Sequence, residues 1–115
     1  MNIEEVREYC LSKENVSESF PFGESTLVFK VFASQERSSG KIFALISLDA
    51  QQMNLKCDPD LAIELREQYD SITPGYHMNK KYWNSLQLNG SLPASLLKEW
   101  IDLSYKLVAK KGKKK

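Results

Sequence analysis

Two runs of β-branched and aromatic residues, 26–32 and 41–48, are separated mainly by the polar segment 34–40. Residues of these types favour extended strands, and a short polar connection lets two such strands pair antiparallel. Residues 53–57 follow, and in them apolar side chains alternate with polar ones, which is typical of a strand with one buried face. The chain is therefore expected to build an antiparallel sheet.

Helical patterns flank these predicted strands. The first helix is expected at about residues 3–13, with Asn2 as its N-cap, because apolar residues recur there at helical spacing. A second is expected at about 59–69, where Asp58 caps the first turn and a proline follows it. Pro93 opens a third helix, which is the longest of the three patterns.

The apolar residues of the third helix predict the side that packs on the sheet. They are Leu96, Trp100, Leu103 and Leu107. Further strands are expected near 72–77 and 83–88, and segment 17–24 is expected to be a structured loop because it contains Pro21 and Gly23. The element order is α-β-β-β-α-β-β-α, an α+β fold in which helices pack on an antiparallel sheet.

Charge is distributed unevenly along the 115 residues, which are enough for one small domain. The chain has 16 basic and 15 acidic side chains, and five of the lysines lie at the end of the sequence: Lys110, Lys111, Lys113, Lys114 and Lys115. Subtracting these five leaves 11 basic and 15 acidic side chains in residues 1–109, a net charge of −4. We expect a single domain over 1–109 and a flexible lysine-rich tail over 110–115, so a nucleic acid would meet a body that is acidic overall.

The N-terminal sequence, the short apolar runs and the two cysteines limit the class of protein and its expected location. No basic start precedes an apolar run, and no stretch approaches the ~18 apolar residues of a membrane-spanning helix. We expect a cytoplasmic monomer without membrane attachment. Cys10 and Cys57 are far apart in the sequence and match no metal or redox spacing, so two free thiols are expected, with a disulfide between them as the alternative.

Catalytic and metal-binding patterns are weak. His77 is the only histidine, which makes a poor metal site. Cys57 precedes a predicted helix, whose N-terminus favours a thiolate, and could act as a nucleophile with His77. Strand alternation instead places Cys57 among the core residues. We expect no enzyme, no metal site and no cofactor.

Four strings of the sequence resemble signatures of the MmcQ/YjbR family. They are SFPFGE at 19–24, LKCDP at 55–59, PGYHMNKKYWN at 74–84 and the Trp-Ile-Asp-x-Ser-Tyr pattern at 100–105. The strings run from residue 19 to residue 105, and the eleven-residue string at 74–84 is the most specific. The resemblance implies a CyaY-like α+β fold and a DNA-binding role through a double wing of two β-hairpins. The lysine tail lies outside these signatures.

The expected DNA contacts are basic, aromatic and amide side chains of the predicted strands and turns. They are Lys80, Lys81, His77, Trp83, Asn84, Lys30, Arg37 and Lys41. Lys80 and Lys81 lie near a predicted hairpin tip, where lysines reach phosphates, although a solvated turn would look the same. Trp83 is expected either to stack on a base or to fold over the core and be buried. His77 is either a contact or a hydrogen-bonded structural residue.

A second hypothesis is a non-enzymatic domain that binds a ligand or another protein. It would use the sheet face and the segment 76–83. It predicts no DNA binding beyond what the lysine tail provides, and an exposed aromatic patch or a concave pocket would favour it.

Overall fold

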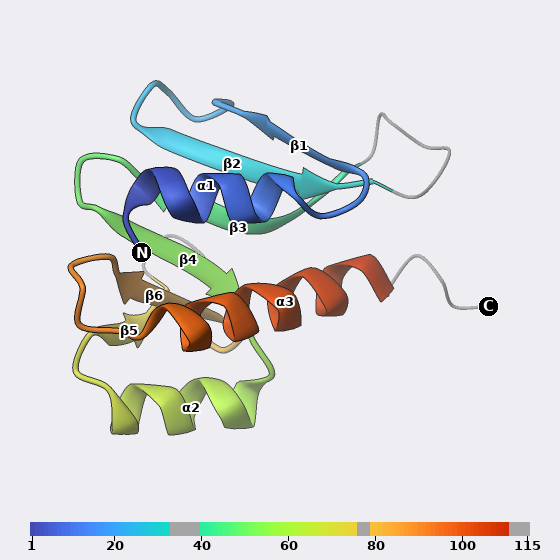
Figure 1. Cartoon of the computed structure of the whole chain (residues 1–115). Coiled ribbons are helices and arrows are strands. Elements are labelled where there is room, and N and C mark those ends of the chain that lie inside the picture. The colour runs from blue at the N-terminus through green and yellow to red at the C-terminus, as the bar shows by residue number, and fades with distance from the viewer. Residues whose placement is uncertain (33–39, 76–78, 111–115) are drawn as a thin grey trace.

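The computed structural model of the chain describes residues 1–32, 40–75 and 79–110. In chain order the elements are α1 (Ile3–Leu11), β1 (Val16–Ser19), β2 (Thr26–Val31), β3 (Lys41–Ser47), β4 (Gln52–Lys56), α2 (Pro59–Gln68), β5 (Ile72–Pro74), β6 (Trp83–Gln87) and α3 (Ala94–Lys110). The strands form one sheet in the order β1-β2-β3-β4-β6-β5, and all neighbours are antiparallel (Figure 1). The expected α+β fold is confirmed.

The first two helices begin where their capping residues predict. Asn2 accepts a hydrogen bond from the Glu5 backbone at 2.8 Å, and the Glu5 carboxylate accepts one from the Asn2 backbone at 3.0 Å. Asp58 caps α2 by accepting from the backbone N–H groups of the next residues, with Pro59 in the first turn. These bonds satisfy N–H groups that a helix leaves unpaired at its start, so the local sequence is sufficient to locate the N-termini of α1 and α2.

Strand β1 is the element that the sequence pattern misses. Three of its four residues, 17–19, were expected to belong to a loop, but the strand pairs along β2 from Val16 opposite Val31 to Ser19 opposite Val28. Glu18 of this strand also binds Arg7 of α1, with 2.6 Å between Nη2 and Oε2. Three of the four residues are polar, so β1 has little strand signal of its own, and pairing with β2 decides its conformation.

All three helices pack on one face of the sheet, with α1 and α3 side by side across it (Figure 1). The main core lies beneath them and includes the fully buried side chains of Phe29, Phe43, Ile46 and Met53. Each such side chain contributes about 1.5–3 kcal/mol by its removal from water. None of the helices in the described ranges is long and apolar enough to cross a membrane.

The side of α3 that faces the core differs from the expected stripe. The buried positions are Leu97, Ile101, Ser104 and Val108, together with Trp100. Leu103 and Leu107 of the expected stripe each remain 38% exposed, so that part of the prediction is wrong. Ser104 explains why the helix is rotated about its axis relative to the expected orientation. Its hydroxyl donates to the Phe43 carbonyl at 2.6 Å and accepts from the Lys56 backbone N–H at 2.9 Å, so this side of α3 must face the sheet.

Candidate functional site

Five lysines gather at one end of the sheet, which we call the lysine end. Antiparallel pairing brings together the end of β2, the start of β3, the end of β4 and the start of β6. These positions, and the turn that precedes β6, carry Lys30, Lys41, Lys56, Lys80 and Lys81. Lys41, Lys80 and Lys81 are exposed, whereas Lys30 and Lys56 are half-buried. Four of the five were expected as site residues, and the structure brings these four together.

Two of the lysines lie on the sheet face away from the helices. Lys30 is opposite Ile42 on β3, and Lys56 is opposite Trp83 on β6. Directly opposed residues point to the same side of a sheet, and Trp83 belongs to a buried cluster separate from the core under the helices. Because neighbouring strands are about 4.8 Å apart, Lys30 and Lys56 are roughly 10 Å apart across β3.

Acidic residues are segregated from this face. Glu18 is the only acidic residue in the six described strands, and it lies on the helix side, where it pairs with Arg7. The three helices instead carry eight: Glu4, Glu5, Glu8, Asp60, Glu64, Glu67, Glu99 and Asp102. With four basic residues against these eight acidic ones, the helices within residues 1–109 carry a net charge of −4. At the lysine end the five lysines outnumber the two carboxylates that follow β4, Asp58 and Asp60, so this end is locally cationic.

The backbone of the turn at 79–82 is held by several hydrogen bonds. The Asn79 side chain accepts from the Lys81 N–H at 2.9 Å, and the Asn79 carbonyl accepts from the Tyr82 N–H at 3.1 Å. Arg66 of α2 donates to the Lys80 carbonyl at 3.3 Å, and the Cys57 N–H donates to the Tyr82 carbonyl at 2.7 Å. The two lysines therefore project from a fixed backbone, with their side chains in solvent.

Trp83 is buried, which confirms the interpretation of this residue as a packing residue. It is 7% exposed and contacts Val28 and Leu45, on the face opposite Leu86. Gly75 is needed beside it, because a Cβ added there would lie 2.8 Å from the Trp83 Cβ. The ring is not available to stack on a base in this structure.

Asn84 is also inaccessible. It is 2% exposed and faces α2, where its Nδ2 donates to the Ala62 carbonyl at 3.2 Å. Its Oδ1 has no hydrogen-bond partner among the described groups and borders a cavity of about 10 Å³, space for about one water molecule. Asn84 therefore contributes to packing and is left out of the surface proposed below. His77 and Arg37 lie outside the described residues.

Two residues of the lysine end were not among the expected contacts. Lys56 lies on the polar side of the alternating segment 53–57, but only the strand order brings it beside Trp83. Tyr82 is 37% exposed, with the Lys81 Nζ 5.8 Å from its ring centroid. An aromatic residue directly after two lysines was a usable signal in the sequence.

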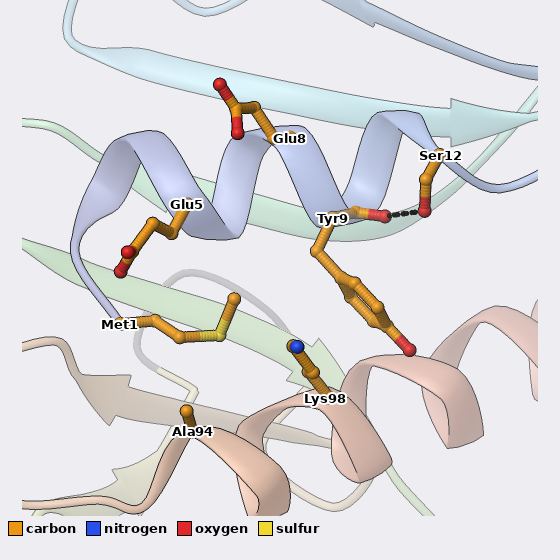
Figure 2. A pocket seen from close by; sticks show the side chains of 7 residues that line it. All are labelled: Met1, Glu5, Glu8, Tyr9, Ser12, Ala94 and Lys98. Carbon is orange, nitrogen blue, oxygen red and sulfur yellow. Dashed lines mark hydrogen bonds between the residues drawn. The ribbon is translucent and has the colours of Figure 1, made fainter.

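A groove of about 430 Å³ lies between α1 and α3 (Figure 2). Glu5 and Glu8 line it from α1, Lys98 lines it from α3, and the Tyr9 ring lies between the helices. Several of its polar groups already serve the fold, since Glu5 completes the α1 cap and the Tyr9 hydroxyl donates to Asp102 at 2.8 Å. The groove is large enough for a small molecule, but few of its polar groups are free to bind one.

The thiols are unsuited to nucleophilic chemistry. Cys10 and Cys57 are both free and buried, which excludes the disulfide alternative. Burial raises the pKa of Cys10 to about 12 and, with the negative charge of Asp58, raises the pKa of Cys57 to about 11. Within the described ranges no three histidine, cysteine or carboxylate side chains are grouped to hold a metal ion.

Comparison with known proteins gives consistent matches over nearly the whole chain. A family model described as YjbR matches residues 11–107. The Escherichia coli K12 protein YjbR is 32% identical over 107 residues, covering 91% of this chain and 85% of that protein. YbdF of Escherichia coli O157:H7 is 40% identical over 91 residues, covering 77% and 69%. Both are described as uncharacterized, so neither brings an activity with it.

Solved structures agree with these matches. The crystal structure of the Deinococcus radiodurans protein DR2400 superposes with a TM-score of 0.88 at 39% identity, covering 99% of this chain and 83% of that chain. A crystal structure of a Pseudomonas syringae protein gives a TM-score of 0.76 at 27% identity, covering 94% and 99%. The fold around the lysine end is therefore shared with known structures.

Proposed function

The chain belongs to the YjbR family, and from that premise we propose that it is a non-enzymatic DNA-binding module whose lysine end contacts phosphates. The observation that carries the proposal is the separation of charge between the two layers of the fold. Lysines lie at one end of the sheet, while eight acidic side chains lie on the helices. A body with a net charge of −4 can attract a polyanion only where its positive charge is concentrated.

The direction of α3 supports the same proposal. The Ser104 hydroxyl ties α3 to Phe43 and Lys56, next to the lysine end. The helix continues from there to Lys110, toward the end of the sheet at which β2 and β4 finish (Figure 1). Six further residues span about 9 Å at 1.5 Å per residue. The described part of α3 therefore ends on the side of the sheet where the lysine end lies, and in the sequence the remaining lysines follow directly after it.

Fluorescence anisotropy across a range of salt tests this proposal. A labelled 20-base DNA, offered as a duplex and as a single strand, is titrated with the full chain and with residues 1–109. Each phosphate contact adds about 0.9 to the salt slope for duplex DNA and about 0.7 for a single strand. We expect Lys80→Ala/Lys81→Ala to lower the slope by up to about 2 contacts' worth. Lys98→Ala, an exposed lysine at the groove between α1 and α3, is the control and should leave the slope unchanged.

The proposal fails if residues 1–109 bind neither form of the DNA at low salt. It also fails if Lys98→Ala and Lys80→Ala/Lys81→Ala weaken binding equally for each charge removed, because binding would then be spread over the whole surface. Each variant must give the same circular dichroism spectrum as the unmodified chain, which shows that it is folded.

The groove between α1 and α3 favours a second candidate function, the binding of a small ligand. Its volume of about 430 Å³ lies within the range of small-molecule sites, and the Glu8 carboxylate, which unlike that of Glu5 takes no part in the α1 cap, suits a cationic ligand. Spermidine is a suitable probe. Amide shift changes confined to the residues around Glu8, Tyr9 and Lys98, together with no DNA binding by residues 1–109, would favour this function over the first.

A further inference from the structure

Tyr82 places an exposed aromatic ring at the lysine end. Three aromatic side chains in the described ranges are large and exposed: Phe20, Phe22 and Tyr82. Phe20 and Phe22 precede β2 and so lie at the opposite end of the sheet, whereas Tyr82 directly precedes β6. Tyr82 is therefore the exposed aromatic residue that is adjacent to the lysines.

The surroundings of the Tyr82 ring combine a flat apolar surface with positive charge. Lys81 Nζ lies 5.8 Å from the ring centroid, and Lys80 is the next exposed side chain along the turn. A nucleotide presents the matching pair of features, a flat base joined to a phosphate. Stacking of a base on an aromatic ring beside lysines is the usual way in which proteins hold an unpaired strand.

The backbone beneath the ring is already fixed. The Tyr82 N–H donates to the Asn79 carbonyl, and the Tyr82 carbonyl accepts from the Cys57 N–H of the neighbouring chain segment. The following residue, Trp83, is buried in the second cluster, with Val28 and Leu45. Binding would therefore order few backbone torsions, which keeps its entropic cost low.

Stacking on Tyr82 requires a base whose face is free, and a duplex hides those faces between base pairs. The helices offer no ready element for the major groove of a duplex, because acidic residues are distributed over all three. The combination of an exposed ring, two exposed lysines and a fixed turn fits an unpaired strand better.

Resting on the function proposed above, we infer that the lysine end takes single-stranded nucleic acid in preference to duplex, with one base stacked on the Tyr82 ring and its phosphates next to Lys80 and Lys81. Tyr82 is then a binding residue for the base, and the lysines supply the contacts that depend on salt. Sequence preference is not part of this arrangement, since every base has a face that can stack.

The test compares a labelled 20-base oligo-dT strand with a 20-base-pair duplex, using the full chain and four variants. Tyr82→Ala removes the ring, Tyr82→Leu keeps apolar bulk without it, and Tyr82→Phe keeps the ring without the hydroxyl. Phe22→Ala, an exposed aromatic at the far end of the sheet, is the matched control. Thermal melting establishes that each variant is folded.

We expect Tyr82→Ala and Tyr82→Leu to weaken binding of the single strand by about 5- to 150-fold, the effect of losing one stacked base. Their salt slope should stay unchanged, because no charge is removed. Tyr82→Phe, which keeps the ring, should restore most of the single-strand binding that Tyr82→Leu loses, and Phe22→Ala should bind as the unmodified chain does.

Two failures can be told apart. If neither the single strand nor the duplex binds, the proposed DNA-binding function is overturned. If binding occurs and depends on Lys80 and Lys81, but the duplex is preferred or Tyr82→Leu has no effect on the single strand, the function stands and the inference about Tyr82 is overturned.

Discussion

Ser104 is the position at which a single hydroxyl should have the largest effect on stability. It is fully buried. Its hydroxyl links β3 to β4, because it donates to the Phe43 carbonyl and accepts from the Lys56 N–H, just beyond the last paired residues of the two strands, Ala44 and Leu55. Ser104→Ala leaves both backbone groups without this partner. An unsatisfied buried group costs about 1–3 kcal/mol, while alanine regains about 0.5 kcal/mol of helix propensity. With two such groups, we expect the free energy of unfolding to fall by about 1.5–5.5 kcal/mol.

Urea unfolding followed by the fluorescence of Trp83 and Trp100 measures this change. The midpoint should fall with an unchanged m-value, and the Tm should drop by roughly 4 °C for each kcal/mol. Ser95→Ala, an exposed serine of the same helix, is the control and should change stability by less than about 0.5 kcal/mol. A loss below about 0.5 kcal/mol for Ser104→Ala would refute the reasoning, because it would mean that Phe43 and Lys56 can pair directly without the hydroxyl.

Two further predictions concern ionisable groups. Burial alone would raise the pKa of Asp102, but hydrogen bonds from Lys13 and Tyr9 lower it below its ordinary value. The ionised carboxylate therefore stabilises the folded state above about pH 4, and this stabilisation is lost as the pH falls through the lowered pKa. Asp102→Asn should accordingly make the Tm less dependent on pH in the acidic range, and an unchanged dependence would contradict this. Because burial raises the pKa of Cys10 and Cys57, both thiols should react with a disulfide reagent at pH 8 only after denaturation, and prompt labelling of the native protein would show the opposite.

Local sequence predicts most elements of this fold. The caps at Asn2 and Asp58 locate two helices, and alternation in segment 53–57 identifies both the strand and its buried side. These signals are strong because they depend on hydrogen bonds and periodicities within a few residues. β1 has no such signal, since a short polar segment becomes a strand only when β2 offers its backbone groups.

The rotation of α3 shows a second limit of local pattern. Leucines at 96, 103 and 107 and leucine or isoleucine at 97 and 101 describe two adjacent apolar stripes, and periodicity alone does not separate them. Ser104 decides which of the two stripes faces the core, although a polar residue is not expected at a buried position. Its hydroxyl is buried because it completes hydrogen bonds between β3 and β4, which belong to a part of the chain some 50 residues earlier.

The candidate site divides in the same way. The sequence by itself determined that Lys80, Lys81 and an aromatic residue are neighbours, and that five lysines follow a stretch, residues 1–109, whose net charge is −4. Only the tertiary structure decided that Lys30, Lys41 and Lys56 join them, that the acidic residues lie mainly on the helices, and that Tyr82 rather than Trp83 is exposed. The physical reason is that charge and burial depend on which strands are neighbours in the sheet, and strand order is set by pairing between distant segments.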